Sequence, residues 1–139
     1  MSDIVVGIDG SEDSKRALRW AVDEAELRGV RVRAVLCWSY LGISGSELGI
    51  GTTEEEARAS LEADVVEAVG DRAAIVDAVP VNDLPVSGIL SSSEGAALLV
   101  VGSRGRGGVK GLVLGSVSRT IVERSTIPVV VVPHEHSEA

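Results

Sequence analysis

Short runs of branched apolar residues alternate along this chain with longer segments whose apolar residues recur every three or four positions. A continuous short apolar run is typical of a strand buried on both faces, and the longer spacing is typical of an amphipathic helix. The runs predict five strands, over 4–8, 31–38, 73–79, 98–101 and 128–132. The periodic segments predict four helices between them, over 11–29, 53–70, 85–93 and 113–124.

Polar residues and glycines mark the ends of the expected helices. Ser11 stands where it can cap the first helix, and Thr53 followed by Glu56 fits a capping box at the start of the second. Gly29 and Gly70 are stop signals at the other ends of these two helices. These signals support two helices that begin and end close to the limits set by the apolar spacing.

The order of the elements predicts the fold class. Strands that alternate with helices imply an α/β fold, and we expect one domain with a doubly wound, five-stranded parallel sheet and helices on both faces. The chain of 139 residues fits that single domain. Pro80 is expected to end the third strand, 39–52 is the one long loop, and 134–139 is a frayed tail. Such sheets bind ligands at the carboxyl ends of their strands, so the turn at 9–11 and the loop at 102–111 are the candidate positions.

Composition excludes several classes of protein. The net charge of −8 makes nucleic acid or an anionic membrane an unfavourable partner. The chain has no phenylalanine, two tryptophans and one tyrosine, so it offers few aromatic rings for stacking bases. Cys37 is the single cysteine and cannot form an internal disulfide. We see no signal peptide or membrane-spanning run, and therefore expect a cytoplasmic location.

One segment departs from the acidic balance. Between positions 102 and 124 there are five basic residues and one acid, and the loop at its start holds five glycines. Glycines let backbone amides approach an anion closely, and Arg104, Arg106 and Lys110 add positive charge. The spacing matches neither the Walker A loop nor the dinucleotide fingerprint. The segment predicts a phosphate cradle, with a solvated surface loop as the alternative.

Three motifs in this order resemble the universal stress protein family. They are the opening run 5–11, the spacing Gly102-x2-Gly105-x9-Gly115-Ser116, and the closing run between Pro128 and Pro133. The resemblance implies a single domain over 1–139 with a five-stranded parallel sheet. It also implies a homodimer that forms through the last strand, here the edge from Pro128 to Pro133.

The same resemblance implies that the chain binds ATP together with Mg²⁺ or Mn²⁺. It puts adenine and ribose near Gly7, Asp9 and Cys37, with Asp9 contacting the nucleoside or the divalent metal ion. Ribose and phosphates would lie against Gly102, Ser103, Arg104, Gly105, Arg106, Gly107 and Gly108, and the terminal phosphates against Gly115, Ser116, Val117 and Ser118. A purely local role for Asp9, as a turn residue, stays open, and so does a preference for cyclic AMP.

The sequence offers no catalytic constellation. His134 and His136 fall in the expected tail, and the acids Glu12, Asp13 and 54–56 are explained by helix dipoles. The leading hypothesis is an ATP-binding stress-response protein that acts as a nucleotide-dependent switch or interaction module. Two alternatives are a nucleotide-free dimeric interaction module that uses the exposed edge strand, and a slow ATPase.

Overall fold

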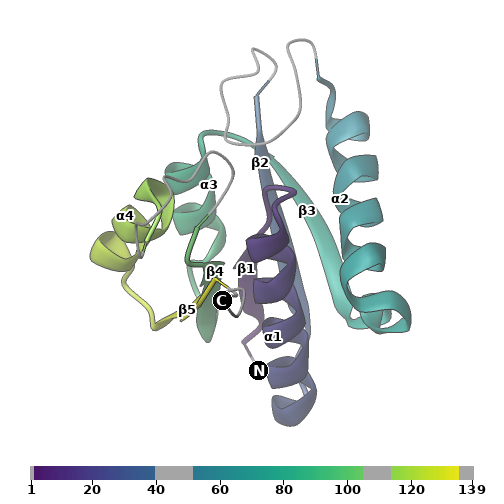
Figure 1. The fold of residues 1–139 in the computed structure, drawn as a ribbon, viewed down its shortest axis with the longest axis horizontal. Coiled ribbons are helices and arrows are strands. Elements are labelled where there is room, and N and C mark those ends of the chain that lie inside the picture. The colour runs from purple at the N-terminus through teal and green to yellow at the C-terminus, as the bar shows by residue number, and fades with distance from the viewer. Residues whose placement is uncertain (1, 40–51, 105–113, 135–139) are drawn as a thin grey trace, which may run out of the picture.

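The computed structural model describes residues 2–39, 52–104 and 114–134, which form a parallel sheet between two layers of helices (Figure 1). In chain order the elements are β1 (Ile4–Gly7), α1 (Glu12–Arg28), β2 (Val32–Trp38), α2 (Glu54–Val69), the 3₁₀ helix η1 (Gly70–Ile75), β3 (Val76–Asn82), α3 (Pro85–Ser92), β4 (Leu98–Gly102), α4 (Ser116–Arg124) and β5 (Val129–Val132). The predicted α/β class and the five parallel strands are confirmed.

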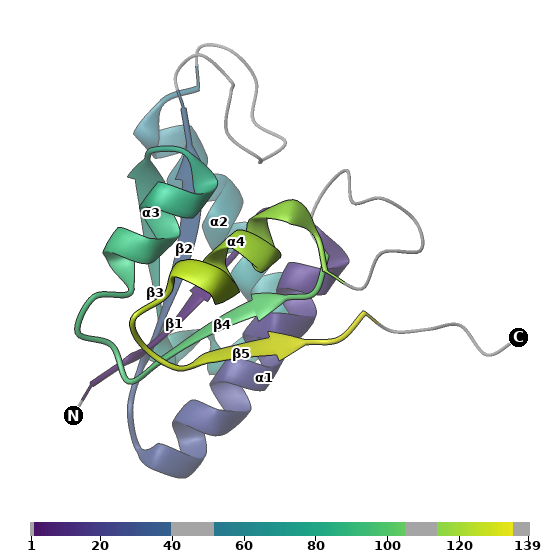
Figure 2. The ribbon, with the colours of Figure 1, turned by 90° about the vertical axis from the view of Figure 1, so that its left-hand side faces the viewer.

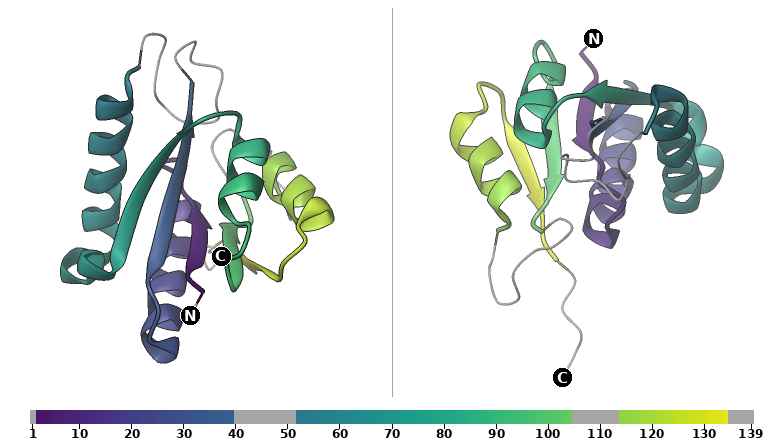
Figure 3. Two further views of the ribbon diagram at one scale, coloured as in Figure 1. Left: turned by 180° about the vertical axis from the view of Figure 1, so that it is seen from behind. Right: turned by 90° about the horizontal axis from the view of Figure 1, so that it is seen from above.

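The strand order is β3-β2-β1-β4-β5, and all neighbouring strands are parallel. The chain builds outward from β1 through β2 to β3, and then crosses back to β4 and β5. Helices α1 and α2 cover one face of the sheet, and α3 and α4 cover the other (Figures 2 and 3). The topological switch point therefore lies between β1 and β4, where α/β sheets bind their ligands.

Two apolar clusters fill the space on the two faces of the sheet. Successive residues of β1 supply both of them, because Ile4 and Val6 pack towards α1 and α2 whereas Val5 packs towards α3 and α4. All three are fully buried. Covering both faces explains why this strand is apolar at consecutive positions rather than at alternate ones.

The predicted ends of the first two helices are confirmed. The Ser11 side chain accepts a hydrogen bond from the backbone of Ser14, and Gly29 ends α1 with a left-handed φ of 71°. Thr53 and Glu56 form the reciprocal capping box that starts α2. Helix α4 starts at Ser116 rather than at position 113, because the extended residue Gly115 is its N-cap; position 113 lies outside the described residues.

The predicted limits of the third strand are wrong. The strand spans Val76–Asn82, residues 70–75 form η1 instead, and Pro80 lies inside the strand opposite Leu36. The physical reason is that β3 is at the edge of the sheet, where an outward-facing position loses no strand-to-strand hydrogen bond to proline. Most of the long loop and positions 135–139 fall outside the described residues.

Candidate functional site

The carboxyl ends of β1 and β4 meet the first turn of α1 at the switch point. A Cβ atom on Gly102 would lie 2.8 Å from the backbone oxygen of Asp13 and 2.9 Å from its carbonyl carbon. The backbone of β4 therefore touches the backbone of α1 directly. Gly102 is not among the described glycines with positive φ, so this position needs glycine for space rather than for its conformational freedom.

Three hydrogen bonds tie the end of β4 to α4 and β5. The Ser118 hydroxyl donates to the Gly102 carbonyl at 2.6 Å, and the Gly115 amide donates to the Ser103 carbonyl at 2.7 Å. The Ser103 amide donates to the carbonyl of Val132 at 2.9 Å. The Ser118 side chain is thus bonded to the backbone of β4, and this bond holds the start of α4 over the end of that strand.

Unpartnered polar atoms gather at the same edge of the sheet. Within the described residues four buried side-chain polar atoms have no hydrogen-bond partner, and three of them are Ser103 Oγ, Arg104 Nε and Trp38 Nε1. Ser103 and Arg104 directly follow β4, and Trp38 is the last residue of β2. The fourth atom, Arg33 Nε, is near the other end of β2. Burying a polar group without a partner costs about 1–3 kcal/mol, so the neighbouring unpartnered atoms Ser103 Oγ and Arg104 Nε at the end of β4 indicate a site for a polar ligand.

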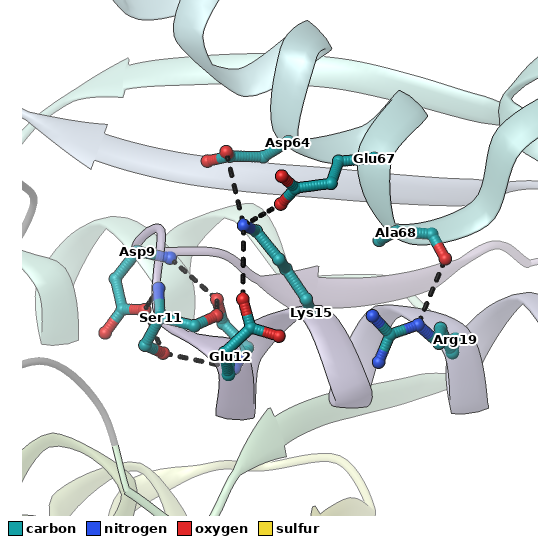
Figure 4. A network of polar contacts seen from close by, with 9 residues as sticks. Asp9, Ser11, Glu12, Lys15, Arg19, Asp64, Glu67 and Ala68 are labelled. Carbon is teal, nitrogen blue, oxygen red and sulfur yellow. Dashed lines mark hydrogen bonds and ion pairs between the residues drawn. The ribbon is translucent and has the colours of Figure 1, made fainter.

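Asp9 follows β1 and organises the turn that leads into α1 (Figure 4). Its Oδ1 atom accepts hydrogen bonds from the Ser11 amide at 2.9 Å and from the Ser11 hydroxyl at 2.6 Å. The Asp9 amide in turn donates to the Ser14 hydroxyl at 3.3 Å. The local turn role left open by the sequence is therefore present. In the part of the chain that the structure describes, no group of three or more His, Cys, Asp or Glu side chains is placed to hold a metal ion.

Gly7 and Cys37 face α3. A Cβ atom on Gly7 would lie 2.8 Å from Cδ1 of Ile89, so the missing side chain makes room for that helix. The Cys37 thiol donates to the Pro85 carbonyl at 3.7 Å, and a Cβ atom on Gly88 would come within 2.5 Å of its sulfur. Burial, together with the nearby Asp83 carboxylate, raises the pKa of Cys37 to about 12. The thiol is thus a protonated packing group, and it has no features of a nucleophile.

An ion-pair network fixes α1 against α2 beside the Asp9 turn (Figure 4). The buried ammonium group of Lys15 donates a hydrogen bond to the Glu67 carboxylate, its nearest partner. It also lies 3.9 Å from Asp64 and 3.5 Å from Glu12. Hydrogen bonding to Glu67 raises the pKa of Lys15, and the same bond lowers the pKa of Glu67. One turn further along, Arg19 Nε donates to the Ala68 carbonyl at 3.0 Å. The first turn of α1 is therefore held firmly on the side away from β4.

Sequence comparison supports a family assignment that agrees with this geometry. Residues 1–133 match the model of the Universal stress protein family. The chain belongs to this family. A universal stress protein of Mycobacterium tuberculosis (strain ATCC 25618 / H37Rv) is 39% identical over 132 residues, which cover 92% of this chain and 44% of that protein. Another from the same strain is 34% identical over 137 residues, with the same coverage. The chain thus spans less than half the length of these curated relatives.

Solved structures of universal stress proteins share the fold. One from Archaeoglobus fulgidus has a TM-score of 0.70 and 27% identity, and the match covers 94% of this chain and 93% of that one. A universal stress protein in complex with cAMP has a TM-score of 0.66 and 25% identity, covering 94% and 95% of the two chains. An Archaeoglobus fulgidus protein in complex with dAMP has a TM-score of 0.69 and 25% identity, covering 94% and 97%. The resemblance inferred from three motifs is confirmed.

The structure brings part of the predicted site of this universal stress protein together. The end of β4 (Gly102, Ser103, Arg104) lies against the start of α4 (Gly115, Ser116, Val117, Ser118), and Gly7, Asp9 and Cys37 lie at or after the ends of β1 and β2. The predicted residues Gly105, Arg106, Gly107 and Gly108 lie outside the described residues. Their contacts with a nucleotide stay predictions.

Sequence reasoning missed two residues at this edge. The Asp13 side chain is only 6% exposed and lies within hydrogen-bond distance of His134, with 2.8 Å between Oδ1 and Nδ1. The interpretation of Asp13 as a helix-dipole acid was incomplete, and His134, expected in a frayed tail, makes this contact. The contact depends on β1 lying beside β4, and on β4 lying beside β5, so no local pattern could reveal it. Only the spacing of Asp13 and Arg16, which pair at 3.2 Å within α1, was a readable signal.

Across residues 2–39, 52–104 and 114–134, no helix combines the length and the apolar character needed to cross a lipid bilayer.

Proposed function

We propose that this universal stress protein binds an adenine nucleotide, ATP with Mg²⁺ or Mn²⁺, at the edge of the sheet between β1 and β4. The observation that carries the proposal is the pair of buried, unpartnered donors Ser103 Oγ and Arg104 Nε. They lie next to the start of α4, whose N-cap Gly115 provides no side-chain cap. Two similar proteins solved with cAMP and with dAMP support an adenine nucleotide as the ligand.

The residues present fit such a ligand. The first turn of α4 points its amides and the positive end of its dipole at the proposed phosphate position, an arrangement that favours anions. Ser103 and Arg104 would donate to the phosphates, and Ser116 would do so from the helix start. Asp9 would contact the nucleoside or the divalent ion, and the ion would neutralise part of the phosphate charge. The segment 105–108 would complete the cradle, as the family resemblance implies.

We further propose that the bound nucleotide acts as a switch on a dimer in a cytoplasmic stress response. The edge strand β5 has three half-buried valines, Val129, Val130 and Val131, which a second copy of the strand would cover. The bond from Ser103 to Val132 connects that strand to the proposed phosphate position. Slow ATP hydrolysis has less support, because it requires Asp9 or a metal-bound water as the base, and Oδ1 of Asp9 already accepts two hydrogen bonds from Ser11.

The proposal is tested by adding a negative charge at the predicted phosphate position, at a residue where the substitution leaves the fold undisturbed, and measuring the affinity for Mg-ATP. Ser116 is exposed and opens α4, so the Ser116→Glu variant adds an acid where the helix dipole stabilises it. The same carboxylate opposes a phosphate, and we expect the Kd for Mg-ATP, measured by calorimetry, to rise at least ~10-fold, equivalent to about 1.4 kcal/mol. The matched control is Ala74→Glu, an exposed position in η1 at the opposite end of the sheet.

The control should bind Mg-ATP as the unmodified protein does. Unchanged affinity in the Ser116→Glu variant would show that the phosphates do not lie at the start of α4. Light scattering with and without Mg-ATP tests the switch: a change in mass on binding is expected. A monomer at high concentration in both states would rule out the dimer through β5.

A further inference from the structure

The Asp13 carboxylate contacts a residue of its own helix and two segments far away along the chain. Its Oδ2 atom accepts a hydrogen bond from the backbone amide of Arg104 at 3.2 Å. Its Oδ1 atom lies 3.2 Å from Nη1 of Arg16 and 2.8 Å from Nδ1 of His134. Arg104 is 91 positions away along the chain and His134 is 121 positions away. This one side chain therefore joins α1 to the segments that follow β4 and β5.

The two carboxylate oxygens of Asp13 bind different partners, and this fixes the orientation of the side chain. With Oδ1 held by Arg16 and His134, Oδ2 is turned towards the Arg104 amide. A carboxylate that is 94% buried is stable only when such donors surround it, and its bonds to them are of the strong, charge-assisted kind. The contact between the backbone of Asp13 and Gly102 brings the same two segments together from the other side.

We propose that Asp13 is a positioning residue of the nucleotide site, and this rests on the proposed function described above. By holding the Arg104 amide, the carboxylate keeps Ser103 and Arg104 in the place where their unpartnered donors face the phosphates. Through His134 it also fixes the segment after β5 to the same point. Asp13 itself touches no ligand in this account, and acts through the Arg104 backbone and His134.

The neighbouring acid provides a matched control for this role. Glu12 also lies in the first turn of α1 and carries the same charge, but its side chain is 74% exposed and pairs with Lys15 on its own helix. Replacing Glu12 by alanine removes one acid from the helix start and leaves the Arg104 amide bonded. An effect on exchange or affinity that Glu12→Ala and Asp13→Ala share is therefore caused by the loss of an acid from the helix start. A difference between the two variants is caused by the loss of the Asp13 contacts.

The experiment compares Asp13→Ala, Asp13→Asn and Glu12→Ala by two measurements. The first is the hydrogen-exchange rate of the Arg104 amide in nucleotide-free protein, and the second is the Kd for Mg-ATP. In Asp13→Ala we expect the amide to exchange about 10-fold faster and ATP to bind about 10-fold more weakly, as loss of a charge-assisted hydrogen bond implies. Asp13→Asn keeps an oxygen acceptor for the amide, so both values should stay within about 3-fold of the unmodified protein. Glu12→Ala should leave both unchanged.

Two results would overturn the proposal: an Arg104 amide in Asp13→Ala that exchanges as in Glu12→Ala, or equal ATP affinity in these two variants. If Asp13→Ala does not fold, His134→Ala replaces it, because the His134 side chain is 41% exposed and its truncation leaves the core intact. It should speed the exchange of the Arg104 amide by a smaller factor, and an unchanged rate would then be decisive against the proposal. If the unmodified protein itself does not bind Mg-ATP, the proposed function fails, and the role of Asp13 in a nucleotide site fails with it.

Discussion

Replacing Gly102 by alanine should destabilise this protein more than the same replacement at Gly7, although the atom nearest to the new methyl group would lie at 2.8 Å in both cases. At Gly102 the added Cβ comes within 2.8 Å of the Asp13 carbonyl oxygen and 2.9 Å of its carbon. These are backbone atoms in the first turn of α1, which Lys15 and its partners hold against α2. Since the helix cannot move aside alone, we expect the cost of an overpacked contact, about 1–3 kcal/mol.

At Gly7 the closest atom is also 2.8 Å from the added Cβ, but it is Cδ1 of Ile89, the far end of a flexible side chain. A change of the Ile89 rotamer relieves the contact at about 0.5–1.5 kcal/mol. Alanine also lowers the conformational entropy of the unfolded chain, which returns about 0.4–1 kcal/mol at either position. The net cost at Gly7 should therefore stay below about 1 kcal/mol.

Urea denaturation followed by circular dichroism measures both free energies of unfolding, with the m-value as a check that the two-state analysis holds. For a chain of this length the Gly102→Ala variant should also melt roughly 3–10 °C lower. A Gly7→Ala variant that is as unstable as Gly102→Ala, or less stable, would refute the reasoning. It would mean that the type of neighbouring atom does not decide the cost. A Gly102→Glu variant is therefore a poor test of nucleotide binding, because its side chain would disturb the packing against Asp13 as well as add a charge.

Two further predictions concern titratable groups. Burial raises the pKa of Cys37 to about 12. Its thiol should therefore react with a thiol reagent at pH 8 at least ~100-fold more slowly in the folded protein than in denaturant. Rapid labelling of the folded protein would contradict the burial of this side chain. The hydrogen bond to Lys15 lowers the pKa of Glu67 below its ordinary value of 4.5. The stability that the ionised carboxylate contributes is therefore complete above pH 4.5, and it is lost as the pH falls through the lower pKa of the folded state. Urea titrations should therefore show Glu67→Gln less stable than the unmodified protein at pH 7, with the difference shrinking below about pH 4.5; a constant difference down to pH 3 would contradict the ion pair.

The elements that depend on local signals were predictable from the sequence. Ser11 and the pair Thr53 and Glu56 cap their helices within a few residues, so reading them requires no knowledge of the sheet. Pro80 was wrongly predicted to end its strand, because the effect of a proline depends on whether the strand is central or at the edge of the sheet. In a central strand it would end the ladder of hydrogen bonds, whereas at the edge position of β3 it is tolerated.

The candidate site was predictable in its residue types but not in its contacts. Gly102 was predicted to let the backbone approach a phosphate, whereas the atom that lies against it in the structure is the carbonyl oxygen of Asp13, in another element. Likewise the sequence places His134 after the last strand, and only the order β1-β4-β5 brings it to α1. Residues far apart in sequence meet at the switch point of the sheet, so their pairing follows from topology and not from spacing.

The most direct test of the central claim is to denature freshly purified protein, identify any released nucleotide by mass spectrometry, and then titrate nucleotide-free protein with Mg-ATP. We expect the released compound, or the titrated ligand, to be an adenine nucleotide bound at one site per chain. An excess of released ADP would favour the slow ATPase. If no nucleotide is released and none binds on titration, the account is contradicted, and the β5 edge is left as the functional surface.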